Sequence, residues 1–128
     1  MAFGTKESST RQVNAGFAKV VAARGSFQDP ALDLADELAG LLGEWLAGDR
    51  GGVELEYELY LAALRNPALR PVAAEWRQEL SDALAERVDP VTARALVALM
   101  DGISLQVLLT GGVYDAGYAR EMPARLIP

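Results

Sequence analysis

The sequence contains neither cysteine nor histidine. Without cysteine, a disulfide framework and a thiolate metal site are both excluded. Without histidine, the chain lacks the commonest general base and the commonest metal ligand, and no Ser-His or Cys-His nucleophile can form. We therefore expect no catalytic residues, no metal and no cofactor. An enzyme that relies on carboxylates and tyrosines is the least favoured of the functions considered.

The chain also has few positively charged residues. It contains 12 lysine and arginine residues and 18 aspartate and glutamate residues, which gives a net charge of −6. A lone DNA-binding domain normally needs a basic face that displaces counterions from the phosphates. The arginines of this chain are scattered among acids and form no basic stripe. We therefore expect that the chain does not bind DNA by itself.

Long apolar runs are also missing. No stretch approaches the roughly 20 uninterrupted apolar residues of a membrane span, and residues 1–6 contain no apolar signal core. We therefore expect a cytoplasmic protein without a membrane partner. What the chain does have is 51% hydrophobic residues in 128 positions, which is enough for a single domain with one core over residues 1–128.

Helix punctuation divides the chain into segments. Three pairs place a capping side chain directly before a proline, as at the start of a helix: Asp29-Pro30, Asn66-Pro67 and Asp89-Pro90. Glycines within 48–52 and at 111–112 supply helix stops. No alternating strand pattern occurs. The sequence predicts an all-α antiparallel bundle of about six helices, near 6–24, 31–48, 53–65, 68–88, 91–110 and 115–126.

The expected helix 91–110 is apolar on nearly all sides. One apolar face carries Leu96, Leu99, Ile103 and Val107. A second, roughly opposite at 100° per residue, carries Ala98, Leu105 and Leu109. Such a helix is buried on nearly all sides. Either it lies at the centre of the bundle, or it lies between its own core and a partner, which implies a dimer. Gly102 within it marks either a local packing gap or a close approach by another helix.

The expected helix 53–65 contains three glutamates. Glu54 and Glu58 share a polar strip with Arg65 and are interpreted as a solvated face. Glu56 projects away from them into an apolar face, where burying a carboxylate is costly unless it is paired. It either meets a hydroxyl or amine group of a ligand, pairs with an arginine of a neighbouring helix, or reaches water at the helix edge.

Large amphipathic side chains are the other candidates for a site. Tyr57, Tyr60, Trp45 and Trp76 either fill the core, with their polar groups bonded to backbone carbonyl groups, or line a pocket and orient a small ligand. Met100 and Ser104, on the apolar helix 91–110, are placed to line the same space or to fill the core.

Three segments resemble one protein family. Residues 3–7, Phe-Gly-Thr-Lys-Glu, resemble the motif that ends the DNA-binding head of TetR-like (tetracycline-repressor-like) transcriptional regulators. Residues 58–70, ELYLAALRNPALR, resemble that family's middle core helix and its Asn/Asp-Pro break. Residues 95–109, ALVALMDGISLQVLL, resemble its penultimate helix. The order and the spacing of the three segments also match.

The resemblance implies a ligand-sensing and dimerising domain of a transcriptional regulator. The DNA-binding head would precede Phe3, residues 1–7 would be the remnant of its end, and residues 8–24 would form a linking helix. A small, mostly apolar effector is then expected among the helices, and DNA contacts belong to the head alone. The alternative is an all-helical interaction module without a small-molecule ligand.

Two sets of site residues follow. The predicted ligand-binding residues are Trp45, Glu56, Tyr57, Tyr60, Leu64, Trp76, Met100 and Ser104. The resemblance also implies that the last two helices pair with those of a second subunit in a homodimer. The predicted residues of that interface are Ala98, Gly102, Leu105, Leu109, Tyr114 and Tyr118.

Overall fold

A computed structural model of the chain describes residues 33–48 and 50–128. This part of the chain contains α-helices, one 3-10 turn and no strand, which confirms the all-α prediction. The elements are α2 (Leu34–Gly48), α3 (Arg50–Arg65), η1 (Pro67–Leu69), α4 (Arg70–Leu84), α5 (Pro90–Thr110) and α6 (Ala116–Leu126). The expected helix 6–24, the remnant 1–7 and the Asp29-Pro30 cap lie outside the described residues.

The predicted caps at the other two prolines are confirmed. The Asn66 side chain accepts a hydrogen bond from the backbone N–H of Ala68, 3.2 Å away, at the start of η1. Asp89 accepts one from the N–H of Thr92, 3.0 Å away, and α5 begins at Pro90. At its other end α5 stops at Gly111, whose φ of 62° lies in the left-handed region that glycine adopts without strain.

Two helix boundaries differ from the prediction. Helix α3 begins at Arg50, so Gly51 and Gly52 lie in its first turn instead of ending the previous helix. Val53, which is fully buried, holds this turn against the core. The expected helix 68–88 opens as a 3-10 turn and ends at Leu84, after which the N–H groups at 87 and 88 both bond to the carbonyl of Leu84.

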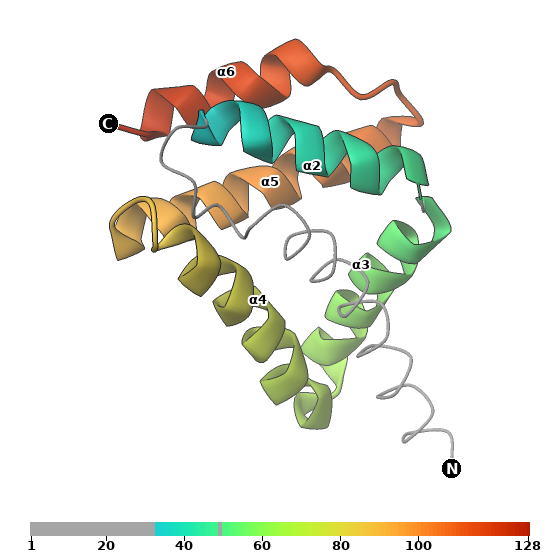
Figure 1. The fold of residues 1–128 in the computed structure, drawn as a ribbon. Helices are drawn as coiled ribbons and strands as arrows, with labels where there is room; N and C mark the ends of the chain where they lie inside the picture. Colours follow the sequence, from blue (N-terminus) through green and yellow to red (C-terminus); the bar gives the residue numbers. More distant parts are fainter. Residues whose placement is uncertain (1–32, 49) are drawn as a thin grey trace.

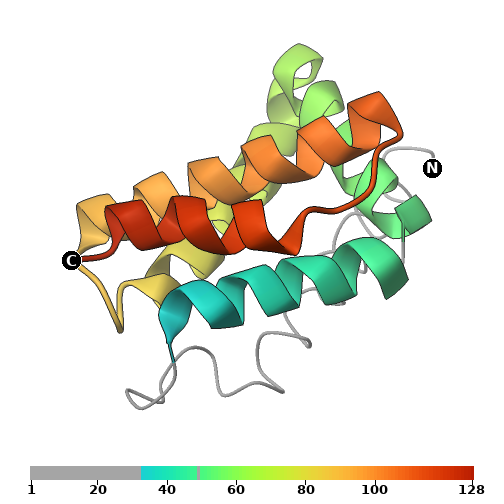
Figure 2. The same cartoon turned by 90° about the horizontal axis from the view of Figure 1, so that it is seen from above.

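The five helices form two parts that share α5. Helices α2, α5 and α6 lie side by side as a layer (Figure 2). Helices α3 and α4 run from this layer and converge at η1, so that α3, α4 and α5 enclose a triangle (Figure 1). Helices α3 and α4 are closest at η1 and move apart toward α5 (Figure 1). Their inner faces therefore face each other beside α5.

The core lies between α2 and α5. At one end, leucines of α2 pack with Leu84 of α4 and with Leu96 and Met100 of α5. At the other end, Leu42 and Leu46 of α2 pack with Val53 of α3, Ile103 and Val107 of α5 and Ala119 of α6. Burying such side chains stabilises the fold by roughly 1.5–3 kcal/mol each. By length and composition alone, α5 would also suit a membrane span, but in this fold it packs against α2, α4 and α6.

Polar contacts fix the outer helices to α2. Arg87, after α4, pairs with the buried Glu37 at 3.2 Å. Arg120 of α6 pairs with Asp36 and, at 3.4 Å, with Asp33. These contacts hold the ends of the bundle, while the middle of α4 meets α5 through a different set of residues.

Candidate ligand-binding site

A cavity of about 540 Å³ lies between α3, α4 and α5. Its walls are mainly apolar, as is usual for small-molecule sites. It is lined from α3 by Tyr57, Tyr60, Leu61, Ala63 and Leu64, from α4 by Arg70, Ala73, Ala74 and Arg77, and from α5 by Asp101 and Leu105. This volume is within the range of cavities that hold drug-sized ligands.

A second, much smaller cavity of about 30 Å³ lies deeper in the bundle and has room for water. It is lined by Leu42, Trp45, Glu56, Tyr60, Trp76, Arg77, Leu80, Met100, Asp101 and Ser104. Tyr60, Arg77 and Asp101 line both cavities. These three side chains therefore form the wall between the outer cavity and the inner one.

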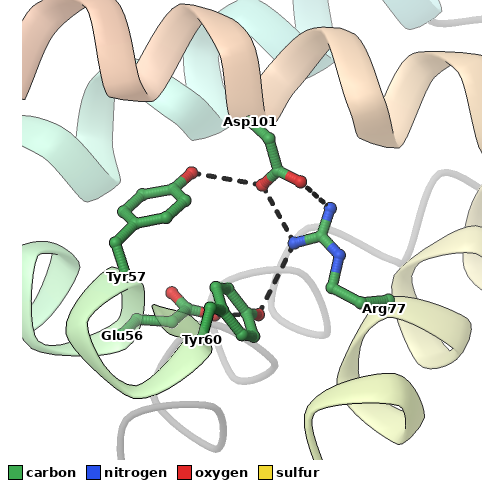
Figure 3. Close-up of polar contacts among 5 residues, drawn as sticks. All are labelled: Glu56, Tyr57, Tyr60, Arg77 and Asp101. Carbon is green, nitrogen blue, oxygen red and sulfur yellow. Dashed lines mark hydrogen bonds and ion pairs between the residues drawn. The ribbon is translucent and has the colours of Figure 1, made fainter. Parts of the chain in front are cut away.

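Five side chains, Glu56, Tyr57, Tyr60, Arg77 and Asp101, form what we call the polar cluster (Figure 3). The Arg77 guanidinium group of α4 pairs with both carboxylate oxygens of Asp101 on α5, and the Nη1–Oδ1 distance is 2.9 Å. Tyr57 of α3 donates its hydroxyl hydrogen to Oδ1 of Asp101 at 3.1 Å. Asp101 thus joins all three walls of the outer cavity.

Tyr60 lies at the centre of the polar cluster. Its hydroxyl group donates to Oε1 of Glu56 at 2.8 Å and accepts from Nη1 of Arg77 at 3.5 Å. The central carbon of the Arg77 guanidinium group lies 5.4 Å from the centre of the Tyr60 ring, within cation–π distance. The rings of Tyr57 and Trp76 meet the Tyr60 ring edge-on, at 5.8 and 5.9 Å between centroids. These contacts hold the Tyr60 ring in one orientation.

Glu56 is the most unusual acid of the chain. Its residue is only 4% exposed, and burial raises its pKa to about 7. The Tyr60 hydrogen bond and the charge of Arg77 oppose this rise, and the charge of Asp101 adds to it. Among the described residues, no group bonds to its Oε2 atom. Near neutral pH, Glu56 therefore exchanges between a neutral acid and a buried carboxylate.

The pKa values of the other four residues of the polar cluster are also shifted by burial and by their partners. Burial raises the pKa of Asp101 above its usual value in spite of the opposing charge and hydrogen bonds of Arg77. Burial by itself lowers the pKa of Arg77, but the charge of Asp101 and the Tyr60 contact outweigh it, so the pKa stays above its usual value. Burial also raises the pKa of Tyr57 and of Tyr60, so both stay protonated as hydrogen-bond donors.

The fold and this site can be compared with known proteins. The family described as tetracyclin repressor-like, C-terminal domain, matches residues 29–128. The chain belongs to this family. No curated protein sequence matches the chain.

Several solved structures are similar to this chain. The multidrug binding protein EbrR complexed with imidazole is 68% identical, with a TM-score of 0.87, over 92% of this chain and 66% of that one. EbrR complexed with ethidium is 65% identical, with a TM-score of 0.87, over 95% and 70%. The TetR-family member SCO1917 from Streptomyces coelicolor A3 is 67% identical, with a TM-score of 0.88, over 93% and 69%. Further EbrR structures contain proflavin and malachite green.

The chain spans about two thirds of the length of these relatives, from 66% to 70% for the three described. The match with this family confirms the resemblance and includes two of the three sequence segments, residues 58–70 and 95–109. The matched region is the C-terminal domain of the family.

All eight residues predicted for ligand binding line one of the two cavities. Tyr57, Tyr60 and Leu64 line the outer cavity, and Leu64 stands at its rim with 67% of its surface exposed. The remaining residues, together with Tyr60, line the inner cavity: Trp45, Glu56, Trp76, Met100 and Ser104. Of the alternatives for Glu56, a position at the helix edge in water is wrong, because the residue is buried. Ligand contact at these residues stays a prediction.

Sequence reasoning missed two charged residues of the site. Asp101 lies on the helix that the sequence presents as apolar on nearly all sides, and Arg77 is one of the arginines scattered among acids, yet the two form the ion pair at the centre of the polar cluster. One signal was available: a carboxylate on a helix that is otherwise apolar needs a buried partner. Within residues 33–48 and 50–128, no group of three or more acidic side chains is arranged to hold a metal ion.

The residues predicted for the dimer interface separate into three groups. Ala98, Leu109 and Tyr118 are exposed, and Gly102 has open space around it, as a partner surface requires. Leu105 lines the outer cavity. Tyr114 also has contacts within its own chain: its hydroxyl group donates to the carbonyl of Ala39 and its ring lies against Gly43, both on α2, and its place in a dimer interface stays a prediction. Gly43 leaves room for the ring.

Proposed function

We propose that this chain is the effector-binding domain of a TetR-like transcriptional regulator and that its effectors are small, flat aromatic cations. The observation that carries the proposal is the polar cluster beside the largely apolar outer cavity: it holds two carboxylates among aromatic rings, Asp101 in the wall between the cavities and Glu56 in the inner cavity behind it. A flat cation gains from burial of its apolar rings, from the aromatic faces and from the carboxylates at the same time.

The charges of the polar cluster favour a cation over an anion. With Glu56 ionised, two negative charges face the single positive charge of Arg77. Oε2 of Glu56 is a buried acceptor without a partner among the described residues, and its negative charge would act on a cation in the outer cavity through the wall between the cavities. The solved EbrR complexes support the same class, because ethidium, proflavin and malachite green are flat or near-flat aromatic cations at neutral pH.

Binding would be coupled to the separation of the DNA-binding heads by a shift between two arrangements of the bundle. An effector changes such an equilibrium only when it binds one arrangement better than the other. Residues of three helices line the outer cavity, so a bound ligand would change the positions of α3 and α4 relative to α5. In the whole regulator, residues 8–24 would transmit this change to a DNA-binding head that precedes Phe3. Because such a regulator acts on DNA, we expect the whole protein in the cytoplasm.

A homodimer through α5 and α6 is part of this proposal. Leu109 and Val113 are 81% and 93% exposed, and Tyr118 and Leu105 are also exposed, which leaves apolar surface along the end of α5 and the start of α6. Apolar surface of this kind is commonly covered by a partner. The alternative of an interaction module without ligand requires a filled interior, and a cavity of about 540 Å³ counts against it.

Titration with ethidium, followed by its fluorescence, tests the proposed function. We expect saturable binding that Ala74→Trp weakens by at least about tenfold, because the indole ring occupies the outer cavity lined by Ala74. Glu75→Trp is the matched control, since Glu75 is its exposed neighbour on α4 and does not line the cavity. No binding to the wild-type chain, or equal loss in both variants, would contradict a cation site in this cavity.

A further inference from the structure

Arg77 makes the contacts that a cationic aromatic ligand needs. Its guanidinium group pairs with both oxygens of Asp101, donates to the hydroxyl oxygen of Tyr60 and lies over the face of the Tyr60 ring. These are a carboxylate, a hydrogen-bond acceptor and a π face. In the wall between the two cavities, the recognition groups for a positive charge are already occupied by a positive charge of the chain itself.

We propose that Arg77 is an internal occupant of the cation subsite and that a cationic ligand binds by displacing its guanidinium group from Asp101 and Tyr60. This inference rests on the proposed function, which it deepens by naming the competitor for the site. Arg77 is then a specificity-determining residue: it lowers the affinity for every cation, and it rejects those that gain too little from the rest of the cavity.

Arg77 and a ligand cation cannot both pair with Asp101 without a loss of binding free energy. Placing a second cation beside Arg77 adds a like-charge contact, which costs several kcal/mol in a partly desolvated site. Removing Arg77 from Asp101 while nothing replaces it leaves a partly buried carboxylate with the Tyr57 hydrogen bond but without an opposite charge, which is also costly. Exchange of one cation for the other avoids both costs. The ion pair therefore keeps Asp101 neutralised when the ligand is absent and releases it when the ligand arrives.

The position of Arg77 allows the exchange. Its side chain is 31% exposed, so one end of it already reaches the surface. The neighbouring cavity residues on α4, Ala73 and Ala74, have small side chains. A long, unbranched side chain keeps its charge in water once it swings outward. Such a swing also breaks a direct side-chain link between α4 and α5, which connects ligand entry to helix position.

Arg70 provides a matched comparison for the charge alone. It also lines the outer cavity, but its guanidinium group donates to the backbone carbonyl groups of Ala63 and Leu64, at 3.0 and 2.9 Å. Arg70→Gln removes a positive charge from the same cavity without releasing a carboxylate. It therefore measures the general electrostatic gain that any loss of positive charge gives to a bound cation.

The test compares ethidium, which is permanently charged, with phenanthridine, its uncharged parent ring system, at pH 8. Arg77→Gln is expected to tighten ethidium binding by at least about tenfold, more than Arg70→Gln does, and to change phenanthridine binding by less than about threefold. Arg77→Lys, which keeps the charge, is expected to bind ethidium like the wild-type chain. Unchanged or weaker ethidium binding in Arg77→Gln would overturn the inference. A wild-type chain that binds no ethidium would instead overturn the proposed function.

A second measurement uses the wild-type chain and does not depend on the folding of Arg77→Gln. In a chain labelled with ¹⁵N-arginine, the side-chain resonances of Arg77 are assigned by their loss in Arg77→Lys. Saturation with ethidium is expected to move them to the position of a solvated guanidinium group, and phenanthridine is expected to leave them in place. Resonances that keep their paired position in the ethidium complex would show that Arg77 stays on Asp101 and would overturn the inference.

Discussion

Tyr60 donates its hydroxyl hydrogen to Oε1 of Glu56, one turn earlier on the same helix, with 2.8 Å between the two oxygens. The other carboxyl oxygen of Glu56 has no partner among the described residues. The bond therefore stabilises the ionised form of Glu56 only in part, while burial acts strongly against it. This imbalance makes the protonation of Glu56 sensitive to pH near neutrality.

Stability is predicted to fall as the pH rises from about 5 to 7. Glu56 has a pKa of about 7 in the folded chain and an ordinary value of 4.5, so between these values the folded state binds one proton more than the unfolded state. The loss amounts to about 3 kcal/mol at most, at 1.4 kcal/mol for each pKa unit. Urea unfolding of the wild-type chain and of Glu56→Gln over this range checks it. A slope of equal size in both proteins would assign the effect to other groups.

Ethidium binding is predicted to change with pH in the opposite sense. Ionisation of Glu56 supplies a second carboxylate near the cation, so binding strengthens as the pH rises through about 7. Between pH 6 and pH 8 the ionised fraction rises about tenfold, which sets the largest expected gain in affinity. Ethidium keeps its charge throughout this range, and Glu56→Gln is expected to show a flat profile. A flat profile in the wild-type chain would remove Glu56 from cation recognition.

Two tyrosine variants distinguish the partners of the two acids. Tyr60→Phe removes the hydrogen bond that lowers the pKa of Glu56, so the pH at which stability falls is expected to move upward. Tyr57→Phe removes a bond to Asp101 instead and is expected to leave that pH unchanged. Each variant is expected to cost about 1–2 kcal/mol of folding free energy. Equal pH profiles for both would show that the Tyr60 bond does not govern Glu56.

The sequence predicted the walls of the site better than its charges. Helix periodicity placed Tyr57, Tyr60 and Trp76 on inward faces, and the structure has them around two cavities. It also presented Glu56 as a carboxylate that needs a partner. The partner in the structure is Tyr60, one helical turn after Glu56. The spacing of four residues allows this contact, but the sequence did not distinguish it from an arginine of another helix or a ligand.

Contacts between helices were beyond the reach of sequence patterns. Arg77 and Asp101 are 24 positions apart, and their pairing depends on how α4 crosses α5. The family resemblance predicted Tyr114 at a partner surface, and its hydrogen bond to Ala39 of α2, 75 positions earlier, is a contact that no sequence pattern indicated. The periodicity of apolar residues along a helix indicates which face is apolar, but it does not indicate which other helix packs on that face.

The contact between Gly43 and Tyr114 predicts a cost for a small substitution. A Cβ atom added at Gly43 would lie 2.9 Å from Cε2 of the Tyr114 ring, which its hydroxyl bond to Ala39 holds in place. Gly43→Ala is therefore expected to destabilise the chain by about 1–2 kcal/mol. Gly48→Ala, which meets nothing within 4 Å on the same helix, is expected to be neutral or slightly stabilising. Thermal unfolding of both variants measures the difference.

A double variant identifies the cause of that cost. In a Tyr114→Leu background the ring is absent, so adding the Gly43→Ala change is expected to cost little beyond the first substitution. An undiminished cost in that background would mean that the ring is not what the new methyl group meets.

Gly102 provides a test of the proposed dimer, because its effect has opposite signs in the two cases. Within one subunit nothing lies within 4 Å of a Cβ atom added there, although Gly102 is in the interior of α5. In a monomer, Gly102→Ala is therefore expected to stabilise the chain by roughly 0.5–1 kcal/mol, since alanine favours the helix more than glycine does. If α5 of a second subunit approaches closely at this position, the methyl group is expected to weaken the dimer.

Light scattering over a dilution series, with Gly48→Ala as the control, distinguishes a stabilised monomer from a weakened dimer. A dimer that Gly102→Ala leaves equally tight would place the interface elsewhere, and the exposed Leu109 would then be the next position to substitute.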